Sequence, residues 1–319
     1  MKAQKLFNGK IPSGIFLLLL SVLFFASCTD DDPVANKDKQ DVQFEATDAA
    51  IDHANVNAVM VTVAELWVNG SKVEGFQATT LELSALTEGK TALMREAQLD
   101  ATSITEVSLV LDYNKDEAGN APGCYVLKAD GKKDELRSDL NQINLKTNID
   151  LLAESTTKIV LDFDLRKMIK EESGDFEFVT GAEMSAYVRT VHKAQAGMVR
   201  GTLNGADTSG RKLVAYIYEK GTFNANAETS GSGSSKVQFA NAVNSDQINA
   251  DGEFVLAFIN KGEYEIIVIE YKDTNRDGTL EITGKAELMT AGSILFNGTE
   301  VKANSETSLD LQLNAILPI

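Results

Sequence analysis

The sequence predicts an all-β protein with two β-sandwich domains behind a lipoprotein signal peptide and a short tether. Apolar and polar residues alternate in many short runs, and turn signals such as Asn-Gly and Asp-Gly separate these runs. Helical periodicity is convincing in only one short stretch. Hydrophobic residues make up 43% of the 319 residues and charged residues 24%, so the chain has enough apolar surface for globular cores.

Residues 1–27 are predicted to be a signal peptide. Three lysines precede an almost wholly apolar run, Ile15 to Phe25, which stops at Ala26-Ser27-Cys28. A basic flank, a short apolar core and small residues before a cleavage point are typical of export signals. The run is also shorter than the roughly 20 residues that span a bilayer.

Cys28 stands at the cleavage point. Phe25-Ala26-Ser27-Cys28 resembles a bacterial lipobox, in which the cysteine is acylated and becomes the mature N-terminus. The resemblance implies a covalent lipid on Cys28, and two or three acyl chains would hold the protein firmly on outer-membrane lipid. The alternative is an ordinary signal peptide followed by a coincidental cysteine.

Residues 28–41 are expected to form an acidic tether. Thr29-Asp30-Asp31-Asp32 is similar to the acidic tag that routes lipoproteins of Bacteroidota-type bacteria to the cell exterior. The alternative is the start of a solvated linker. Interpreted as an export tag, the acidic segment predicts an outer-membrane, lipid-anchored protein that is exposed on the cell surface.

Residues 42–194 are predicted to be the first β domain, beginning with a strand at 42–48. Apolar residues alternate over 59–63 and then change phase, which predicts a bulge near Ala64-Glu65. Asn69-Gly70 predicts a tight hairpin, because both central positions of a type I′ turn need positive φ. Further strands or short apolar segments are expected at 81–86, 107–111, 125–127 and 159–165, with a second hairpin at Asp130-Gly131.

One short helix is predicted at Leu165–Glu172, with Asp164 as its N-cap. Asp162 and Asp164 project from the same face of the preceding strand, which makes them candidates for acid and base work or for a metal. A helix cap for Asp164 and a turn hydrogen bond for Asp162 are the simpler interpretation.

The order of these segments resembles a bacterial lipoprotein domain known as domain of unknown function 4382, over about 42–191. The similar segments are Ala46-Thr47-Asp48-Ala49, Leu83 to Gly89, Val107 to Leu111 and Val160 to Leu165. Ala50 stands where the family has proline. The resemblance implies an all-β cell-envelope module without an assigned activity.

Residues 195–319 are predicted to be an immunoglobulin- or transthyretin-like sandwich. Strands are expected at 199–203, 213–218, 254–258, 264–271 and 309–313, and Asn297-Gly298 is expected to join 294–296 to Val301 in a hairpin. Glu228 to Ser235 is expected to be a flexible loop. The segments at 197–201, 214–218, 252–254 and 261–264 are similar to a carboxypeptidase regulatory-like, transthyretin-type sandwich.

Residues 273–281 form the sharpest candidate metal site. The predicted calcium ligands alternate along this loop: Asp273, Asn275, Asp277, the Thr279 carbonyl and Glu281. Gly278 would allow the sharp turn, and calcium takes six to eight oxygens. Gly284 occupies the place of an EF-hand's bidentate glutamate, so a polar hairpin loop is the alternative. Residues 112–116 show a similar but less complete pattern of oxygen side chains, and they are interpreted as a solvated loop.

Motifs for catalysis are not apparent in the sequence. The two histidines, His53 and His192, are far apart, and neither a glycine-rich phosphate loop nor a Gly-x-Ser-x-Gly elbow occurs. Cys124 is interpreted as a small buried apolar residue. The net charge of −17 opposes binding to nucleic acid. A non-catalytic protein is therefore expected.

The predicted function is that of a surface-exposed, lipid-anchored envelope protein with a structural or adhesin-like binding role, stabilised by calcium. Its partner is an unknown protein or glycan. The alternative is a glycan-capture module of a nutrient-uptake system, which would need exposed aromatic rings. Trp67 is the only tryptophan in the chain, and core burial or an edge position is expected for it.

Overall fold

The structure is a computed structural model that describes residues 39–49, 56–152, 155–172, 174–275 and 280–319. Contacts group residues 38–319 into one compact unit. Strands dominate this unit, so the predicted all-β class is confirmed. Apolar side chains nevertheless gather mainly into separate clusters before and after residue 196.

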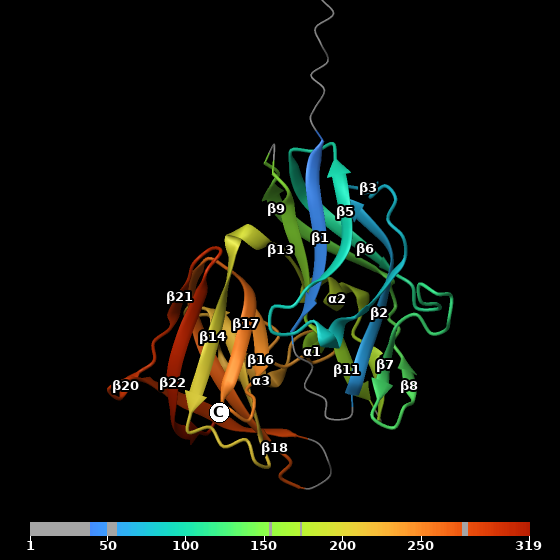
Figure 1. Cartoon of the computed structure of the whole chain (residues 1–319). Coiled ribbons are helices and arrows are strands. Elements are labelled where there is room, and N and C mark those ends of the chain that lie inside the picture. The colour runs from blue at the N-terminus through green and yellow to red at the C-terminus, as the bar shows by residue number, and fades with distance from the viewer. Residues whose placement is uncertain (1–38, 50–55, 153–154, 173, 276–279) are drawn as a thin grey trace, which may run out of the picture. The chain divides into compact units, whose positions relative to one another are not determined.

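Two large sheets and a two-stranded one form the first half in the described residues (Figure 1). One large sheet has the strand order β13 (Val188–His192), β10 (Thr157–Phe163), β1 (Gln40–Asp48) and β5 (Ala92–Leu99). The other has the order β8 (Lys133–Glu135), β7 (Tyr125–Lys128), β2 (Val56–Val68), β6 (Ser103–Leu111) and β9 (Gln142–Asp150), with β3 (Ser71–Lys72) and β4 (Thr79–Glu82) also paired to β2. Strand β1 runs parallel to β10 and antiparallel to β5.

The two large sheets share one apolar core. Phe44, Ile159 and Leu161 of the first sheet and Val61 and Leu109 of the second are all fully buried in the same cluster. Residues between them on the strands point to the opposite face, as the two-residue repeat of a strand requires. Val160, for example, belongs to a different cluster with Phe258 of the second half.

Local predictions in this half agree with the structure. The pairing of β2 with β6 shifts register between Val63 and Glu65, where the bulge was expected. Asn69 and Gly70 have φ of 49° and 77°, and they connect β2 to β3. Strands β7 and β8 pair around Asp130-Gly131 as predicted.

The helix prediction is only partly right. Asp164 does cap α1, but α1 covers only Leu165–Met168. Residues Ile169–Glu172 form β11, which pairs with β12 (Asp175–Phe178), because the cross-strand ladder and burial of Ile169 favour the extended backbone there. A second helix, α2 (Gly181–Tyr187), begins at a capping box that Thr180 and Glu183 form.

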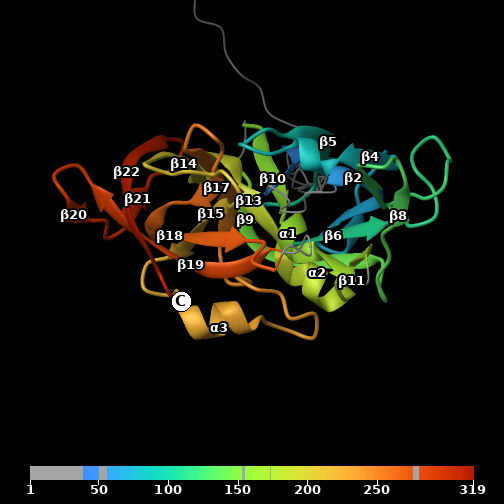
Figure 2. The same ribbon diagram turned by 90° about the horizontal axis from the view of Figure 1, so that it is seen from below.

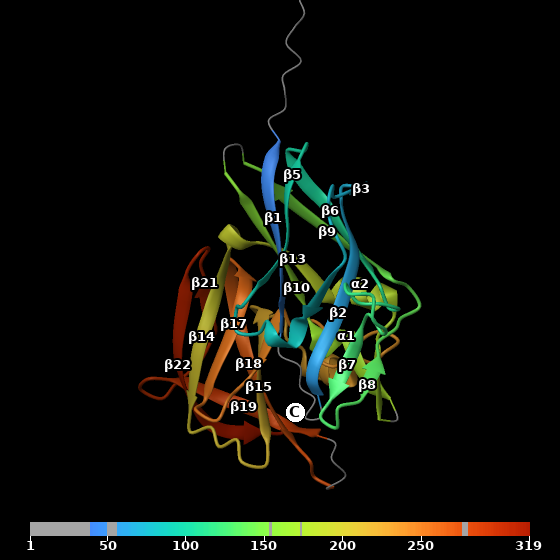
Figure 3. The ribbon, with the colours of Figure 1, turned by 45° about the vertical axis from the view of Figure 1, so that its right-hand side comes forward.

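The second half is one long sheet. Its order is β16 (Asn244–Gln247), β15 (Lys212–Glu219), β18 (Gly262–Lys272), β19 (Glu281–Thr290), β22 (Glu306–Leu317), β14 (Ala196–Asn204) and β17 (Glu253–Asn260). The sheet curls round (Figure 3), and its end strands β16 and β17 lie side by side (Figure 1). There the Asp246 carboxylate on β16 accepts a hydrogen bond of 2.7 Å from the Val255 N–H on β17. Its core includes the buried Val199, Ile217 and Phe254.

The hairpin predicted at Asn297-Gly298 is wrong. Strand β20 (Ile294–Leu295) pairs with β19, whereas β21 (Thr299–Val301) pairs with β18 (Figure 2). Gly298 has a φ of 101°, but Asn297 does not adopt the positive φ that a type I′ turn needs. Each flanking segment instead forms its backbone hydrogen bonds with a longer neighbouring strand.

Short helical segments connect the strands. They are η1 (Leu83–Ala85), η2 (Lys193–Gln195) and α3 (Ala225–Ser230), which lies outside the second sheet (Figure 2). No helix in the described part of the chain is long and apolar enough to cross a membrane.

Candidate functional site

Asp162 lies where the two halves meet, and it does not make the turn hydrogen bond that was expected of it. It stands on β10 directly opposite Arg189 of β13, and the buried carboxylate forms an ion pair with the half-buried guanidinium. Arg189 also donates to the Phe258 carbonyl at 3.3 Å, and Asn244 donates to Asp162 Oδ2 at 3.5 Å. Register on the sheet places the arginine there, because Asp162 and Arg189 are paired residues of neighbouring strands.

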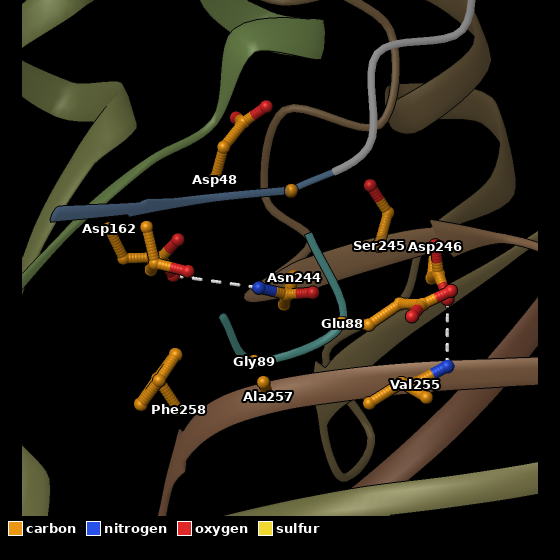
Figure 4. Close-up of a pocket in the computed structure, with 12 residues that line it drawn as sticks. Asp48, Glu88, Gly89, Asp162, Asn244, Ser245, Asp246, Val255, Ala257 and Phe258 are labelled. Atoms are coloured by element: carbon orange, nitrogen blue, oxygen red, sulfur yellow. Dashed lines mark hydrogen bonds between the residues drawn. The ribbon is translucent and has the colours of Figure 1, made fainter. Parts of the chain in front are cut away.

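A cavity of about 10 Å³ adjoins this ion pair (Figure 4). Asp162, Asn244, Ser245 and Phe258 are among the residues that line it. This volume is about that of one water molecule, so the cavity is far smaller than the 300–1,000 Å³ typical of ligand pockets. The Oδ1 atom of Asp162 is buried without a hydrogen-bond partner, and one water would satisfy it.

Asp164 belongs to a separate ion pair. Its carboxylate accepts from the Lys167 N–H at 3.3 Å, as the predicted N-cap should, and Lys167 Nζ lies 2.9 Å from Oδ2. Burial lowers the pKa of Lys167, while Asp164 opposes that shift. The two carboxylates are therefore compensated by different cations and do not form an acid–base pair.

The cations of α1 also hold a distant segment of the chain. Arg166 donates to the carbonyls of Gln238 and Phe239, and Lys167 donates to the carbonyl of Ala242 at 2.6 Å. Glu183 of α2 accepts from the Ser235 N–H at 3.0 Å and from its hydroxyl at 2.6 Å. The stretch expected to be a flexible loop therefore includes a helix and docks on the first half.

A larger groove lies at the free edge of the first sandwich, beside β5. Its volume is about 650 Å³. The lining comes from four places in the chain: residues 39 and 41–42, 73–75, 95–99 and 156. Val42 and Val73 are buried beneath it, and Arg95 lies in its wall. The sequence offered no signal for this groove, because no two of the four segments are adjacent in the chain.

Arg95 has few partners in the groove. Nη2 donates to the Glu74 carbonyl at 3.0 Å, and Nε is buried without an acceptor. Within the described ranges it forms no ion pair with a carboxylate. A Cβ on Gly75, which has a φ of +69°, would lie 2.5 Å from Nη2, so glycine leaves the space that the guanidinium occupies.

The predicted calcium ligands are only partly visible. Asp277 and Thr279 lie outside the described residues. Glu281 Oε2 accepts from both the N–H and the hydroxyl of Thr274 at 2.9 Å, a contact within the loop that the polar-hairpin alternative also explains. No group of three or more His, Cys, Asp or Glu side chains among the described residues is placed to hold a metal ion. Calcium binding stays a prediction.

The remaining candidate residues fall into two groups. Cys28 and His53 lie outside the described residues, so lipidation also stays a prediction. Cys124 is fully buried as predicted, and burial raises the pKa of its thiol to about 12, so it is unsuited to act as a nucleophile. Burial lowers the pKa of His192, which is half-buried.

Trp67 is half-buried on β2, opposite Ser108 of β6. Its indole N–H donates to Glu65 Oε2 at 2.9 Å, and Lys72 Nζ lies 2.7 Å from Glu65 Oε1. The ring is thus held on the outer side of the sheet and is not part of the core, which leaves the glycan alternative open.

A family model matches part of the chain. Residues 39–179 match the family model described as Domain of unknown function (DUF4382). This match confirms the resemblance predicted for the first half, and it carries no assigned activity. The transthyretin-type resemblance of the second half stays a prediction. No curated protein matches the sequence.

Several solved structures show distant similarity. They include the major pilin subunit BcpA of Bacillus cereus, at 9% identity and a TM-score of 0.19, with 86% of this chain and 69% of that chain covered. The minor pilin GBS52 of Streptococcus agalactiae has 12% identity, a TM-score of 0.20 and coverages of 87% and 98%. The shaft pilin SpaA of Lactobacillus rhamnosus GG has 11% identity, a TM-score of 0.20 and coverages of 88% and 100%. TM-scores this low carry no argument about the fold or function of this chain.

Proposed function

We propose that the protein is a lipid-anchored, surface-exposed and non-catalytic component of the outer envelope, with a structural or adhesin-like binding role. The observation that carries the proposal is Cys28 at the end of the apolar run, followed directly by three aspartates. An acylated cysteine would anchor the chain without a membrane-spanning helix. The acidic residues would direct the anchored protein outward.

The arrangement of charges supports a non-catalytic role. Asp162 and Asp164, the best candidates for acid and base work, are each paired with a cation: the half-buried Arg189 and the buried Lys167 respectively. A general base has to reach a proton of the substrate. The cavity beside Asp162 has room for a water molecule only.

Protease treatment of intact cells tests the exposure of the protein. Immunoblotting should show loss of the protein from intact cells, as in a lysed control, and Cys28→Ser should abolish incorporation of labelled palmitate. Protection of the protein in intact cells would place it on the periplasmic side and would remove the adhesin-like role. Unchanged palmitate labelling of Cys28→Ser would remove the anchor.

Calcium is proposed to stabilise the loop at residues 273–281. A ligand that binds only the folded state raises its stability by mass action. We expect the melting temperature of the purified protein to fall when a chelator is added and to recover with calcium. Equal melting with calcium, with magnesium and with chelator would refute the site.

Glycan capture is a second candidate, and the position of Trp67 favours it. The half-buried indole lies among polar side chains on the outer face of the sheet, where a sugar ring has access to it. Binding to a polysaccharide array that is lost in Trp67→Ala, at an unchanged melting temperature, would support this function. Equal binding by the variant would exclude Trp67 as the contact.

A further inference from the structure

We propose that the groove beside β5 binds an extended peptide segment of a partner protein, which adds a strand to the free edge of β5 and places a carboxylate on Arg95. This proposal names a class of partner for the binding role proposed above. It rests on that role only for where in the cell the partner is met. Three features of the groove point to this occupant: its backbone edge, its apolar floor and its unused cation.

The exposed backbone edge of β5 favours a polypeptide as the ligand. Strand β5 is the last strand of its sheet and pairs only with β1 in the described part of the chain (Figure 1). Within the described residues, the N–H and C=O groups on its outer side therefore have no ladder partner. An extended peptide supplies the matching donors and acceptors at the strand spacing, which a sugar or a small acid does not.

The groove runs along this edge. It is lined by five consecutive residues of β5, from Arg95 to Leu99, and on the opposite wall by residues 73–75. The opposite wall is a turn, in which the Phe76 N–H donates to the Val73 carbonyl at 3.3 Å. Among the described residues, no further strand occupies the space beside β5. The groove's volume of about 650 Å³ accommodates several residues of an extended chain.

Apolar residues at the base of the groove would bury one face of the added strand. Ala97 and Leu99 pack against the core of the first half at the open edge, and Val42 and Val73 are buried beside them. Side chains of a strand alternate between its two faces, so every second residue of the peptide would contact this floor.

Arg95 supplies the charge. Register pairs it with Phe44, so it shares the inner face of the sheet with Ala97 and Leu99. The acids Asp41 and Glu96 lie on the other face and accept hydrogen bonds from Gln98 and Gln43. An arginine has five N–H donors, and among the described residues only one hydrogen bond from Arg95 is made, to the Glu74 carbonyl. A carboxylate matches the planar guanidinium in a bidentate pair.

The test uses the purified full-length chain and a phage-displayed library of random linear peptides. We expect the selected peptides to share an acidic residue within an alternating apolar pattern. A bound peptide should slow hydrogen exchange of amides within residues 92–99. Arg95→Gln should weaken binding about tenfold or more, because it removes a charge-assisted pair.

Two controls make the outcome specific. Arg200 is an exposed arginine on β14 in the second half, and Arg200→Gln, which makes the same change of charge, should leave peptide binding unchanged. Replacing the acidic residue of the peptide by its amide should weaken binding to the wild-type protein and have little further effect on Arg95→Gln.

Other outcomes would overturn the proposal. No enrichment from the library, or protection of amides outside residues 92–99, would show that the β5 edge is not the site. An acidic polysaccharide or acetate that binds through Arg95 without slowing exchange in β5 would assign the groove to a non-peptide anion. Purified protein is used throughout, so these results are independent of whether the protein reaches the cell surface.

Discussion

Two arginines on the same sheet have opposite surroundings. Arg189, on the edge strand β13, is paired with a buried carboxylate and with the carbonyl of Phe258. Arg95, on the edge strand β5, has only the carbonyl of Glu74 as a partner within the part of the chain that the structure describes. One edge of the sheet is covered by the second half of the chain, and the other edge is open. The covered edge compensates a buried charge, whereas the open edge leaves a cation and a strand backbone accessible, which is where we propose that a peptide binds.

The largest effect is expected at the covered edge. Arg189→Ala leaves Asp162 buried without a compensating charge, which should lower the free energy of unfolding by about 3 kcal/mol or more. Urea denaturation measures this loss. Arg200→Ala is the matched control, and its exposed side chain should matter by no more than about 0.5 kcal/mol. Equal midpoints for the two variants would mean that the buried pair does not stabilise the fold.

Glu183 should have the next largest effect. Burial opposes its charged form, but hydrogen bonds from Ser235 and Thr180 outweigh burial and lower the pKa to about 2. Its contribution is therefore present above the ordinary pKa of 4.5 and is lost as the pH falls through about 2. Glu183→Gln should cost about 2 kcal/mol at pH 7, from lost hydrogen bonds to a charged group.

The pH dependence distinguishes this effect from simple loss of packing. The difference in stability between the wild type and Glu183→Gln should shrink between pH 4.5 and pH 2, as followed by urea denaturation across that range. Glu82 is exposed and its side chain does not cap η1, so Glu82→Gln serves as the control. A difference that stays constant over this range would contradict the assigned role.

Asp48 should have a smaller effect of the opposite sign. Burial raises the pKa of this carboxyl well above its ordinary value, and the neighbouring Asp164 and Asp162 add to the shift. The folded state therefore binds the proton more tightly than the unfolded state, and stability falls as the pH rises above about 3.8. Asp48→Asn keeps an acceptor for the Leu165 N–H and should gain about 1 kcal/mol at pH 8 relative to pH 4. Denaturation at the two pH values checks this, and an equal difference at both would refute it.

The smallest effect is expected at the open edge. Arg95→Gln removes one hydrogen bond to a carbonyl and leaves no buried carboxylate uncompensated, so the free energy of unfolding should change by less than about 1 kcal/mol. Thermal or urea denaturation without any peptide is the measurement. A loss as large as that of Arg189→Ala would show that Arg95 is a structural residue, and the contrast between the two edges would disappear.

The strand pattern and several turns were accessible from sequence because short-range physics governs them. The bulge near Glu65, the positive φ of Asn69 and Gly70, and the cap at Asp164 all depend on residues a few positions apart. The capping box of α2 was also readable, since Thr180 and Glu183 have the required spacing and precede a short helix. It was overlooked because the helix is so short.

The sequence by itself determined the all-β class and the burial of Cys124. The export signal at the N-terminus lies outside the described residues and stays a prediction. Tertiary structure alone decided that Asp162 is neutralised by Arg189, that residues 233–235 dock on Glu183, and that β20 and β21 pair with different strands. It also decided that Arg95 lies in an open groove. Alternation and turn chemistry act over a few residues, whereas the compensation of a buried charge depends on which distant strands become neighbours.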